Sequence, residues 1–402
     1  MRKLMILGGS AYIIPVIRKA HELGLYVITC DYLPDNIAHR FSDEYCNVSV
    51  TDKEAVLNAA MSLKIDGIIS FACDPGVVSA AYVAEKMGLP FQGPYESVRI
   101  LQDKGLFKDF LLRNGFNTPT AKSYTDREVP FNDIDIFNWP VIVKPVDSAG
   151  SKGVMSADTP EQLQEAIENA VSGSRSGAFI IEDLLVFDGF HSDADAFTVD
   201  GRLEFITYSD ELFDTQASNP FTPAWTIWPG SMKQKYREDL TRQTQRLMDL
   251  LHMKTGIYNI ETCAATDGKA YIMEVSPRGG GGKLAEVIEM SMGPALIENE
   301  IRKAVGLPLI PFEQHDIDGH WCELVVYAKR EQSGILKQIV IDDEIRDRYL
   351  MLEDYFVEPG AKVCPFTGAN MSLGVIFLKF GTREELDRIV GSSEDWLHII
   401  LE

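Results

Sequence analysis

The sequence has few cysteines, and their spacing is not typical of disulfide scaffolds or metal centres. The six cysteines are scattered along 402 residues, with no Cys-x-x-Cys pair. This pattern argues against a small disulfide-bonded secreted protein and against a cysteine–zinc module. We expect reduced thiols that are mostly buried, in a cytoplasmic protein.

Positive charge is scarce, and long apolar runs are absent. The chain has 38 Lys and Arg against 60 Asp and Glu, a formal net charge of −22. This charge argues against nucleic acid or an anionic membrane as the main partner, although a few local Lys or Arg with Mg²⁺ would still allow a nucleotide to bind. No stretch approaches the ~20 apolar residues of a membrane span, and the LMIL of residues 4–7 is too short for the core of a secretion signal.

The length indicates two or three domains, because 402 residues exceed one ordinary core. Strand and helix patterns alternate through about the first 90 residues, which predicts a doubly wound α/β unit. Glycines follow the first strand and Asp31 follows the second, as in dinucleotide-binding sites. Residues 8–13 (GGSAYI) lack the G-x-G-x-x-G spacing, so a tight strand–helix turn is the favoured interpretation and a nicotinamide site the alternative.

A β-hairpin is predicted around Asp267-Gly268, because two β-rich runs flank this pair. In a two-residue turn both residues take φ > 0, and counting outward places Glu261 opposite Glu274 and Asn259 opposite Ser276, all on one face. Facing carboxylates repel and predict a cation between them, and Mg²⁺ prefers such oxygen ligands. The alternative is an exposed hairpin with solvated acids.

A second polar region begins where a strand, residues 139–145, closes on Lys144. A loop of small residues with Lys152 follows, and its backbone N–H groups would be free to wrap phosphate oxygens. The loop has no G-x-x-x-x-G-K-[ST] motif, and an ordinary Ser/Gly loop is the alternative. The strand at residues 178–185 has two interpretations. Its backbone would hydrogen-bond the edge of a purine base, or the segment is an ordinary core strand.

Two further segments carry open interpretations. Residues 213–230 form a predicted long loop without secondary structure, rich in aromatic residues and proline; such loops are often functional. Its Trp225 and Trp228 either wall a substrate pocket or pin the loop to the core. His191 lies in an acidic segment typical of the surface. From about residue 311 the chain is rich in strands, the first three of which predict a small antiparallel cap.

The order of these features resembles the ATP-grasp superfamily. An α/β unit is followed by a lysine at a helix start (Lys104), a strand lysine, a Lys-Gly loop, a glutamate-containing hinge and a hairpin that ends in Glu274-x-Ser-x-Arg278. The resemblance implies a fold of the α/β and α+β classes, with a doubly wound pre-ATP-grasp domain and a small β-rich C-terminal subdomain. The implied domains are residues 1–103, 104–310 with a mobile lid at about 118–183, and 311–402.

The resemblance also implies roles for matching positions. Those that would contact ATP are Lys104, Lys144, the closing-loop residues Ser148, Ser151, Lys152 and Gly153, the hinge residues Glu182, Asp183 and Leu185, and His191 near the ribose. The metal positions are Glu261, Glu274 and Ser276, the last where the family usually has Asn, which leaves the second metal open. Arg278 and Lys144 match catalytic positions, and the substrate would contact Arg278, Gly279 and Gly280. Trp225 and Trp228 are further candidate substrate contacts from the aromatic segment alone, not from the resemblance.

The implied activity is that of a carboxylate–amine ligase, similar to carbamoyl-phosphate-synthetase-like single-module ligases and L-amino-acid ligases. It would use ATP with one or two Mg²⁺, or Mn²⁺ in their place, to form an acyl phosphate, which an amine converts to an amide or peptide-like bond with release of ADP and phosphate. The expected partners are a small-molecule carboxylate and amine, with no nucleic acid and no membrane; a homodimer is expected from the family alone. The alternatives are a catalytically weak nucleotide-binding module and a nicotinamide-dependent oxidoreductase.

Overall fold

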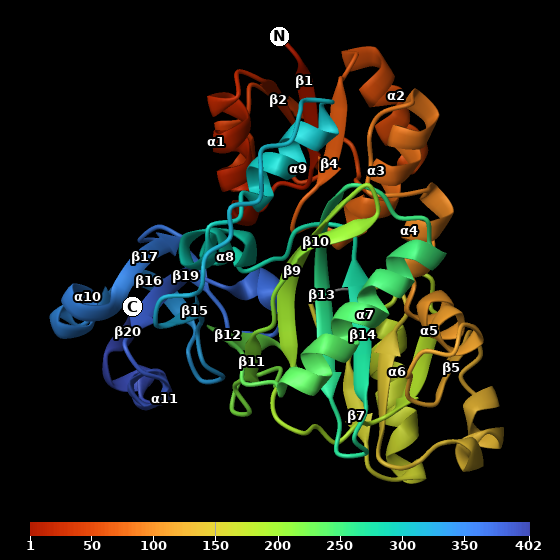
Figure 1. The fold of residues 1–402 in the computed structure, drawn as a ribbon. Helices are drawn as coiled ribbons and strands as arrows, with labels where there is room; N and C mark the ends of the chain where they lie inside the picture. Colours follow the sequence, from red (N-terminus) through yellow and green to blue (C-terminus); the bar gives the residue numbers. More distant parts are fainter. Residues whose placement is uncertain (149) are drawn as a thin grey trace.

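The computed structural model describes residues 1–148 and 150–402, and its N-terminal part is a parallel sheet covered by helices (Figure 1). The strands pair in the order β3-β2-β1-β4, and the central strand β1 is almost wholly buried because helices cover both faces. The elements are β1 (Lys3–Leu7), α1 (Ile14–Glu22), β2 (Tyr26–Cys30), β3 (Glu44–Cys46), α2 (Lys53–Leu63), β4 (Gly67–Ser70), α3 (Asp74–Met87) and α4 (Tyr95–Gln102). This confirms the predicted doubly wound unit.

The glycine turn after β1 packs against neighbouring side chains. A Cβ added to Gly9 would lie 2.6 Å from the Cβ of Asn36 and 2.8 Å from the imidazole ring of His39. Asn36 and His39 therefore fill the space over this turn. The glycine is explained by this close packing, which favours the tight-turn interpretation over a dinucleotide site.

The next segment forms a small unit with its own sheet and core. Its antiparallel strands pair in the order β5-β8-β6-β7, and α6 packs on them around Val141, Ile167 and Phe179. The elements are α5 (Lys104–Arg113), β5 (Ala121–Tyr124), β6 (Val141–Pro145), β7 (Met155–Ala157), α6 (Leu163–Gly173) and β8 (Phe179–Asp183). A separate core is what a lid subdomain would need, and residues 118–183 remain our proposal for one.

The central sheet holds the predicted hairpin as its strands β13 and β14, in the order β10-β9-β13-β14. Its elements, with the long helix α7 that packs against it, are β9 (Ser192–Val199), β10 (Arg202–Ile206), α7 (Gln234–Leu250), β13 (Gly256–Ala264) and β14 (Ala270–Ser276). Glu261 pairs with Glu274 and Asn259 with Ser276, as predicted. The four side chains therefore share one face of the sheet.

The hairpin turn differs from the prediction. Ala265 N–H donates to Lys269 O at 2.9 Å, so the loop has three residues, and only Gly268 in it has a positive φ, of 83°. This shifts the pairing near the tip by one residue. A β-bulge at Met273 shifts it back, because Thr262 pairs with Ile272 while Glu261 pairs with Glu274. The longer turn and the bulge shift the register in opposite directions, so Glu261 still pairs with Glu274.

The remaining strands form two sheets on the other side of the molecule. The larger has the order β11-β12-β15-β19-β17 and the smaller β18-β16-β20. The elements are β11 (Asp210–Phe213), β12 (Pro223–Trp228), β15 (His320–Val326), β16 (Gly334–Ile341), α10 (Asp343–Tyr349), β17 (Leu350–Tyr355), β18 (Lys362–Val363), β19 (Gly374–Phe380), α11 (Arg383–Gly391) and β20 (Leu397–Leu401).

Two predictions about this region are wrong. Residues 213–230 are not a loop without secondary structure, because β12 lies within them and pairs with β11 and β15. The first three C-terminal strands do not form one cap, because β16 belongs to the smaller sheet. The domain boundary at residue 311 remains a proposal, although β12 before it and β15 after it share a sheet.

Two helices connect the central sheet with the N-terminal domain: α8 (Leu284–Met292) and α9 (Leu296–Ala304). Glu300 of α9 is 1% exposed and accepts hydrogen bonds from Gln92 Nε2 at 2.8 Å, Ile257 N at 3.1 Å and Lys303 Nζ at 2.8 Å. The backbone of α9 also approaches β4, where a Cβ on Gly67 would lie 2.4 Å from Ala304 O. Within the described ranges, no helix is both long and apolar enough to span a lipid bilayer.

We expect Glu300→Ala to lower the free energy of unfolding by about 3–5 kcal/mol, because it leaves the buried ammonium of Lys303 unpaired. Urea unfolding followed by circular dichroism measures this. The matched control is Glu298→Ala, which breaks the partly exposed pair with Arg302 on the same helix and should cost less than about 1 kcal/mol. Equal losses in the two variants would contradict a connecting role for Glu300.

Candidate functional site

A cavity lies where the central hairpin, α5 and the small antiparallel unit meet. Six predicted site residues line it together, although they come from six different elements or connections. Its lining residues are Leu101, Lys104, Phe107, Lys108, Lys144, Glu182, His191, Glu261, Met273 and Glu274. Residues up to 170 positions apart in sequence therefore form one polar site, as in the contact between Lys104 and Glu274.

One end of the cavity has two lysines beside a buried glutamate. Lys108 Nζ and Lys144 Nζ each lie 3.6 Å from Glu182 Oε2. Glu182 is 1% exposed, and neither of its carboxylate oxygens has a hydrogen-bond partner among the residues that the structure describes. Burial alone would raise the pKa of Glu182, but the two ammonium groups outweigh it and hold the pKa below its ordinary value. This end carries a net positive charge and unused polar atoms, as a nucleotide site requires.

Lys108 was missed in the sequence, although a signal for it was present. It lies four residues after Lys104 on α5, so the two side chains share one face of the helix. Burial, which outweighs the attraction of Glu182, lowers its pKa. Its ammonium also donates to Met273 O at 3.3 Å, which connects α5 to the bulge in β14.

The other end of the cavity holds the paired carboxylates. Lys104 forms an ion pair with Glu274, and Glu261 faces Glu274 across the strands without a salt bridge of its own among the described residues. Burial and the charge of Glu274 raise the pKa of Glu261 to about 7. Oxygen ligands that repel one another in a buried site fit a divalent cation such as Mg²⁺.

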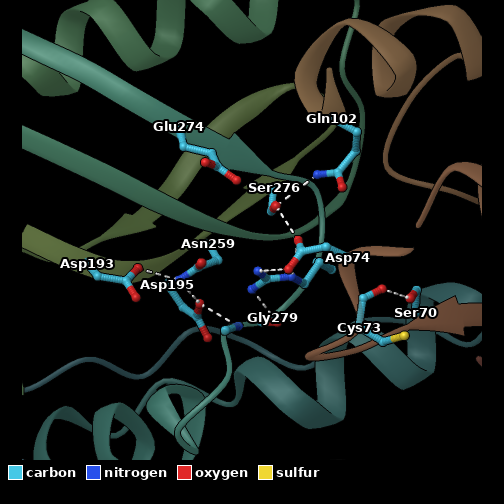
Figure 2. A network of polar contacts seen from close by, with 12 residues as sticks. Ser70, Cys73, Asp74, Gln102, Asp193, Asp195, Asn259, Glu274, Ser276 and Gly279 are labelled. Carbon is cyan, nitrogen blue, oxygen red and sulfur yellow. Dashed lines mark hydrogen bonds and ion pairs between the residues drawn. The ribbon is translucent and has the colours of Figure 1, made fainter. Parts of the chain in front are cut away.

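Ser276, the last residue of β14, contacts Asp74 and Gln102 of the N-terminal domain (Figure 2), and Arg278 just after it also contacts Asp74. The Ser276 hydroxyl donates to Asp74 Oδ1 at 2.6 Å and accepts from Gln102 Nε2 at 2.8 Å. Arg278 binds the same carboxylate with two donors, Nε to Oδ1 at 2.8 Å and Nη2 to Oδ2 at 2.7 Å. The hydroxyl oxygen keeps one lone pair beyond these two hydrogen bonds, and the metal role of Ser276 stays a prediction.

The glycines after Arg278 allow close backbone approach. Ala72 N donates to Gly279 O at 3.0 Å, and a Cβ on Gly279 would lie 2.2 Å from the ring of Phe71. Gly280 N donates to Asp195 Oδ1 at 2.9 Å. These two glycines therefore position the chain between the N-terminal domain and β9, and their predicted substrate contact remains a prediction.

The predicted phosphate loop contacts the connection between β11 and β12. Ser151 Oγ donates to Phe221 O at 2.7 Å, and Asn219 Nδ2 donates to Ser151 O at 3.0 Å. Gly153 packs closely, because a Cβ there would lie 2.9 Å from Cγ of Pro145. Ser148 is half-buried and Lys152 exposed, and the phosphate contacts of all four loop residues stay predictions.

The hinge residues lie beside the cavity in different ways. Asp183 accepts hydrogen bonds from Asn138 N at 2.8 Å and Asn138 Nδ2 at 2.7 Å, and Leu185 packs near the hairpin.

His191, which the resemblance places near the ribose, lines the cavity. Its ring centroid lies 4.1 Å from that of Phe187, edge to face, and burial lowers its pKa to about 4. His191 is therefore neutral at physiological pH.

The two tryptophans lie on opposite faces of β12 and outside this cavity. Trp228 is fully buried and packs toward the N-terminal domain and α8. Trp225 packs on the other face and lines a separate hollow with Leu324, Lys329 and His398. Their placement favours the interpretation in which the tryptophans pin this segment to the core.

Comparisons with known proteins agree with this fold. Residues 137–286 match the sequence profile of the ATP-grasp domain. The chain is 25% identical over 310 residues to a formate-dependent phosphoribosylglycinamide formyltransferase of Synechococcus sp. (strain WH7803), covering 76% of this chain and 77% of that protein. It is 24% identical over 257 residues to the C-terminal section of the carbamoyl phosphate synthase large chain of Aquifex aeolicus (strain VF5), covering 64% of this chain but 47% of that protein.

Among solved structures, an L-amino acid ligase from Bacillus licheniformis superposes with a TM-score of 0.80 at 20% identity, over 100% of this chain and 99% of that one. The match extends the likeness of the fold beyond residues 137–286 to the whole chain. Residues 137–286 therefore match the ATP-grasp domain, and the whole chain has the fold of the L-amino acid ligase.

The raised pKa of Glu261 gives a prediction for the metal-free protein. Below pH ~4 this side chain is protonated in both states; as pH rises toward about 7 the folded protein retains a proton that the unfolded chain loses, so stability falls. We expect Glu261→Gln to raise the free energy of unfolding by about 1–3 kcal/mol at pH 8 and to change it little at pH 4.

Thermal unfolding in buffers with a chelator measures this difference. Adding Mg²⁺ at pH 8 should raise the melting temperature of the wild type and not that of Glu261→Gln. The control is Glu204→Gln, an exposed glutamate on β10 of the same sheet, which should follow the wild type. A wild-type melting temperature that is insensitive to Mg²⁺ would count against a metal between the carboxylates.

Proposed function

We propose that this protein is an ATP- and Mg²⁺-dependent carboxylate–amine ligase. The observation that carries the proposal is that one cavity has two lysines beside the orphaned carboxylate of Glu182 at one end and the facing pair Glu261 and Glu274 at the other. A nucleoside triphosphate needs both a base and ribose site and a metal at the phosphates. The cavity supports each requirement with residues of suitable charge.

The residues of the cavity take the following proposed roles. Lys104, Lys144 and Lys108 neutralise phosphate charge, and the backbone after Glu182 binds the base while neutral His191 lies near the sugar. Glu261 and Glu274 hold one Mg²⁺, which supplies charge neutralisation at the transferring phosphoryl group. A second metal is not part of the proposal, because the Ser276 hydroxyl is engaged by Asp74.

Arg278 is the proposed catalytic arginine for the acyl phosphate. Asp74 fixes its guanidinium by two hydrogen bonds, which orients it and leaves Nη1, now on Gly279 O at 3.0 Å, as the donor nearest the glycine segment. A substrate carboxylate attacks the γ-phosphorus, ADP leaves, and an amine then displaces phosphate. Closure of the loop at 148–153 keeps water from the acyl phosphate.

A nucleotide-binding module without catalysis is the second candidate. It is favoured by one observation: in this structure Asp74 engages both Ser276 and Arg278, so part of their hydrogen-bonding capacity is already occupied. We further propose a cytoplasmic protein, and a homodimer as for other members of the superfamily.

Release of ADP from ATP tests the proposal, over a panel of amino acids and small carboxylic acids with Mg²⁺. We expect release only with ATP, Mg²⁺ and a suitable carboxylate together, and a fall of about 100-fold or more in Glu274→Gln, because the metal loses a charged ligand. Glu204→Gln is the control and should keep the wild-type rate. Binding of ATP with no turnover across the panel would instead support the second candidate.

A further inference from the structure

Acidic side chains from two sheets lie on faces that point toward one another. In the larger C-terminal sheet Glu211 pairs with Thr226, and Thr226 pairs with Glu323, so these three form one row on one face. In the central sheet Asp195 pairs with Asn259, and Asp193 of the same strand projects from the same face. Four carboxylates therefore come from the two sheets.

Packing shows that these faces meet. Phe377 pairs with Glu323, and Trp228 lies two residues from Thr226, so both share the face of the acidic row. Phe377 and Trp228 belong to the hydrophobic cluster that contains Leu284 of α8 and Phe197 of β9, which projects from the same face as Asp195. This face of the C-terminal sheet is therefore directed at β9 and at the start of α8.

The glycine segment between β14 and α8 lies between the acidic groups. A Cβ on Gly282 would lie 2.8 Å from Glu323 Oε1, and Gly280 N donates to Asp195 Oδ1 at 2.9 Å. Gly281 has open space, with no atom within 4 Å of an added Cβ. Two of the carboxylates are thus aimed at one short segment that has room beside it.

Charge is not balanced at this place. Asp195 is 0% exposed and Glu323 2% exposed, and Asp195 Oδ2 and Glu323 Oε1 lack any hydrogen-bond partner in the described part of the chain. The nearest guanidinium, that of Arg278, is held by Asp74. Burial raises the pKa of Glu323 to about 8 and that of Asp195 to about 7. Buried carboxylates without a partner are costly, and a bound cation would offset that cost.

The spacing of these acids favours an organic cation over a metal ion. Within residues 1–148 and 150–402, no three Asp, Glu, His or Cys side chains come close enough together to hold a metal ion. Alkylammonium groups have several N–H donors and suit carboxylates that are spread over a wider space.

We propose that this place is a binding subsite for a substrate with two basic nitrogens, such as a diamine or a basic amino acid. One ammonium group would lie at Asp193 and Asp195 of β9, and the second at Glu211 and Glu323 of the facing sheet. The interpretation of the bound molecule as a substrate rests on the proposed ligase function. The binding of a dication at this place does not depend on that function.

Thermal shift at pH 7.5 tests the binding without any need for catalysis. The probes are 1,4-diaminobutane and 1-aminobutane, compared at equal concentration and matched ionic strength. We expect the diamine to raise the melting temperature of the wild type by about 2 °C or more, and the monoamine to raise it less. Glu323→Gln and Asp195→Asn should at least halve the diamine shift, and Glu204→Gln should retain it.

Both variants remove a buried carboxylate charge and keep an amide oxygen as an acceptor, in Asp195→Asn for the N–H of Gly280, so they are expected to fold. No difference between diamine and monoamine in the wild type would overturn the proposal, whatever the variants do. An unchanged diamine shift in both variants would also overturn it, because the amine would then bind elsewhere.

ADP release with matched substrates separates this proposal from the ligase function. The pairs are L-lysine with L-norleucine and L-ornithine with L-norvaline, which differ by the second ammonium group. We expect the basic member to be preferred, and its KM to rise about tenfold in Glu323→Gln with the KM for ATP unchanged. Preference for the neutral members would overturn the cation subsite and leave the ligase intact. Diamine binding with no ADP release from any carboxylate would contradict the ligase function and leave the cation subsite intact.

Discussion

Electrostatic repulsion between Glu261 and Glu274 is the constraint around which the cavity is arranged. The two carboxylates face each other on neighbouring strands, and burial removes the water that would screen them. The protein offsets part of this with Lys104, which pairs with Glu274. The repulsion that Glu274 exerts on Glu261 is not offset in this way. A folded protein tolerates such a group where a bound ligand neutralises the charge.

Buried charges are also balanced by opposite charges at two other points of the site, with different partner residues. Glu182 is buried but lies beside two lysines, so it stays ionised and its end of the cavity is positive. Arg278 is buried and paired with Asp74 of the N-terminal domain. The charged groups of the site thus come from separate units of the fold, and the site is complete only where those units meet.

Much of the cavity could be predicted from local sequence patterns. Alternating apolar residues and an Asp-Gly turn signal gave the hairpin, and period two along each strand placed Glu261 against Glu274. The turn itself was predicted with two residues instead of three, since an Asp-Gly pair suits both kinds of turn. A bulge at Met273 restored the register, and nothing in the local pattern of apolar residues marks such a bulge.

Other features depend on contacts between distant segments and could not be derived in this way. Asp74 lies about 200 residues before Ser276 and Arg278, and only the fold brings the three together. Residues 213–230 were predicted as a loop because proline and aromatic residues dominate them, whereas pairing with β15, roughly 100 residues later, makes part of them a strand. Lys108 is different, because its four-residue spacing from Lys104 was visible in the sequence.

The hydrogen bonds of Glu300 have a consequence for motion. They join residue 92, α9 and β13, and with the contact of Gly67 on Ala304 they hold the N-terminal domain against the central sheet. Two connections bound the segment from β5 to β8 of the small antiparallel unit, each with an exposed glycine in the left-handed region: Gly115, φ 68°, and Gly189, φ 108°. We propose that rotation about these two glycines is the motion by which a nucleotide enters and leaves the cavity.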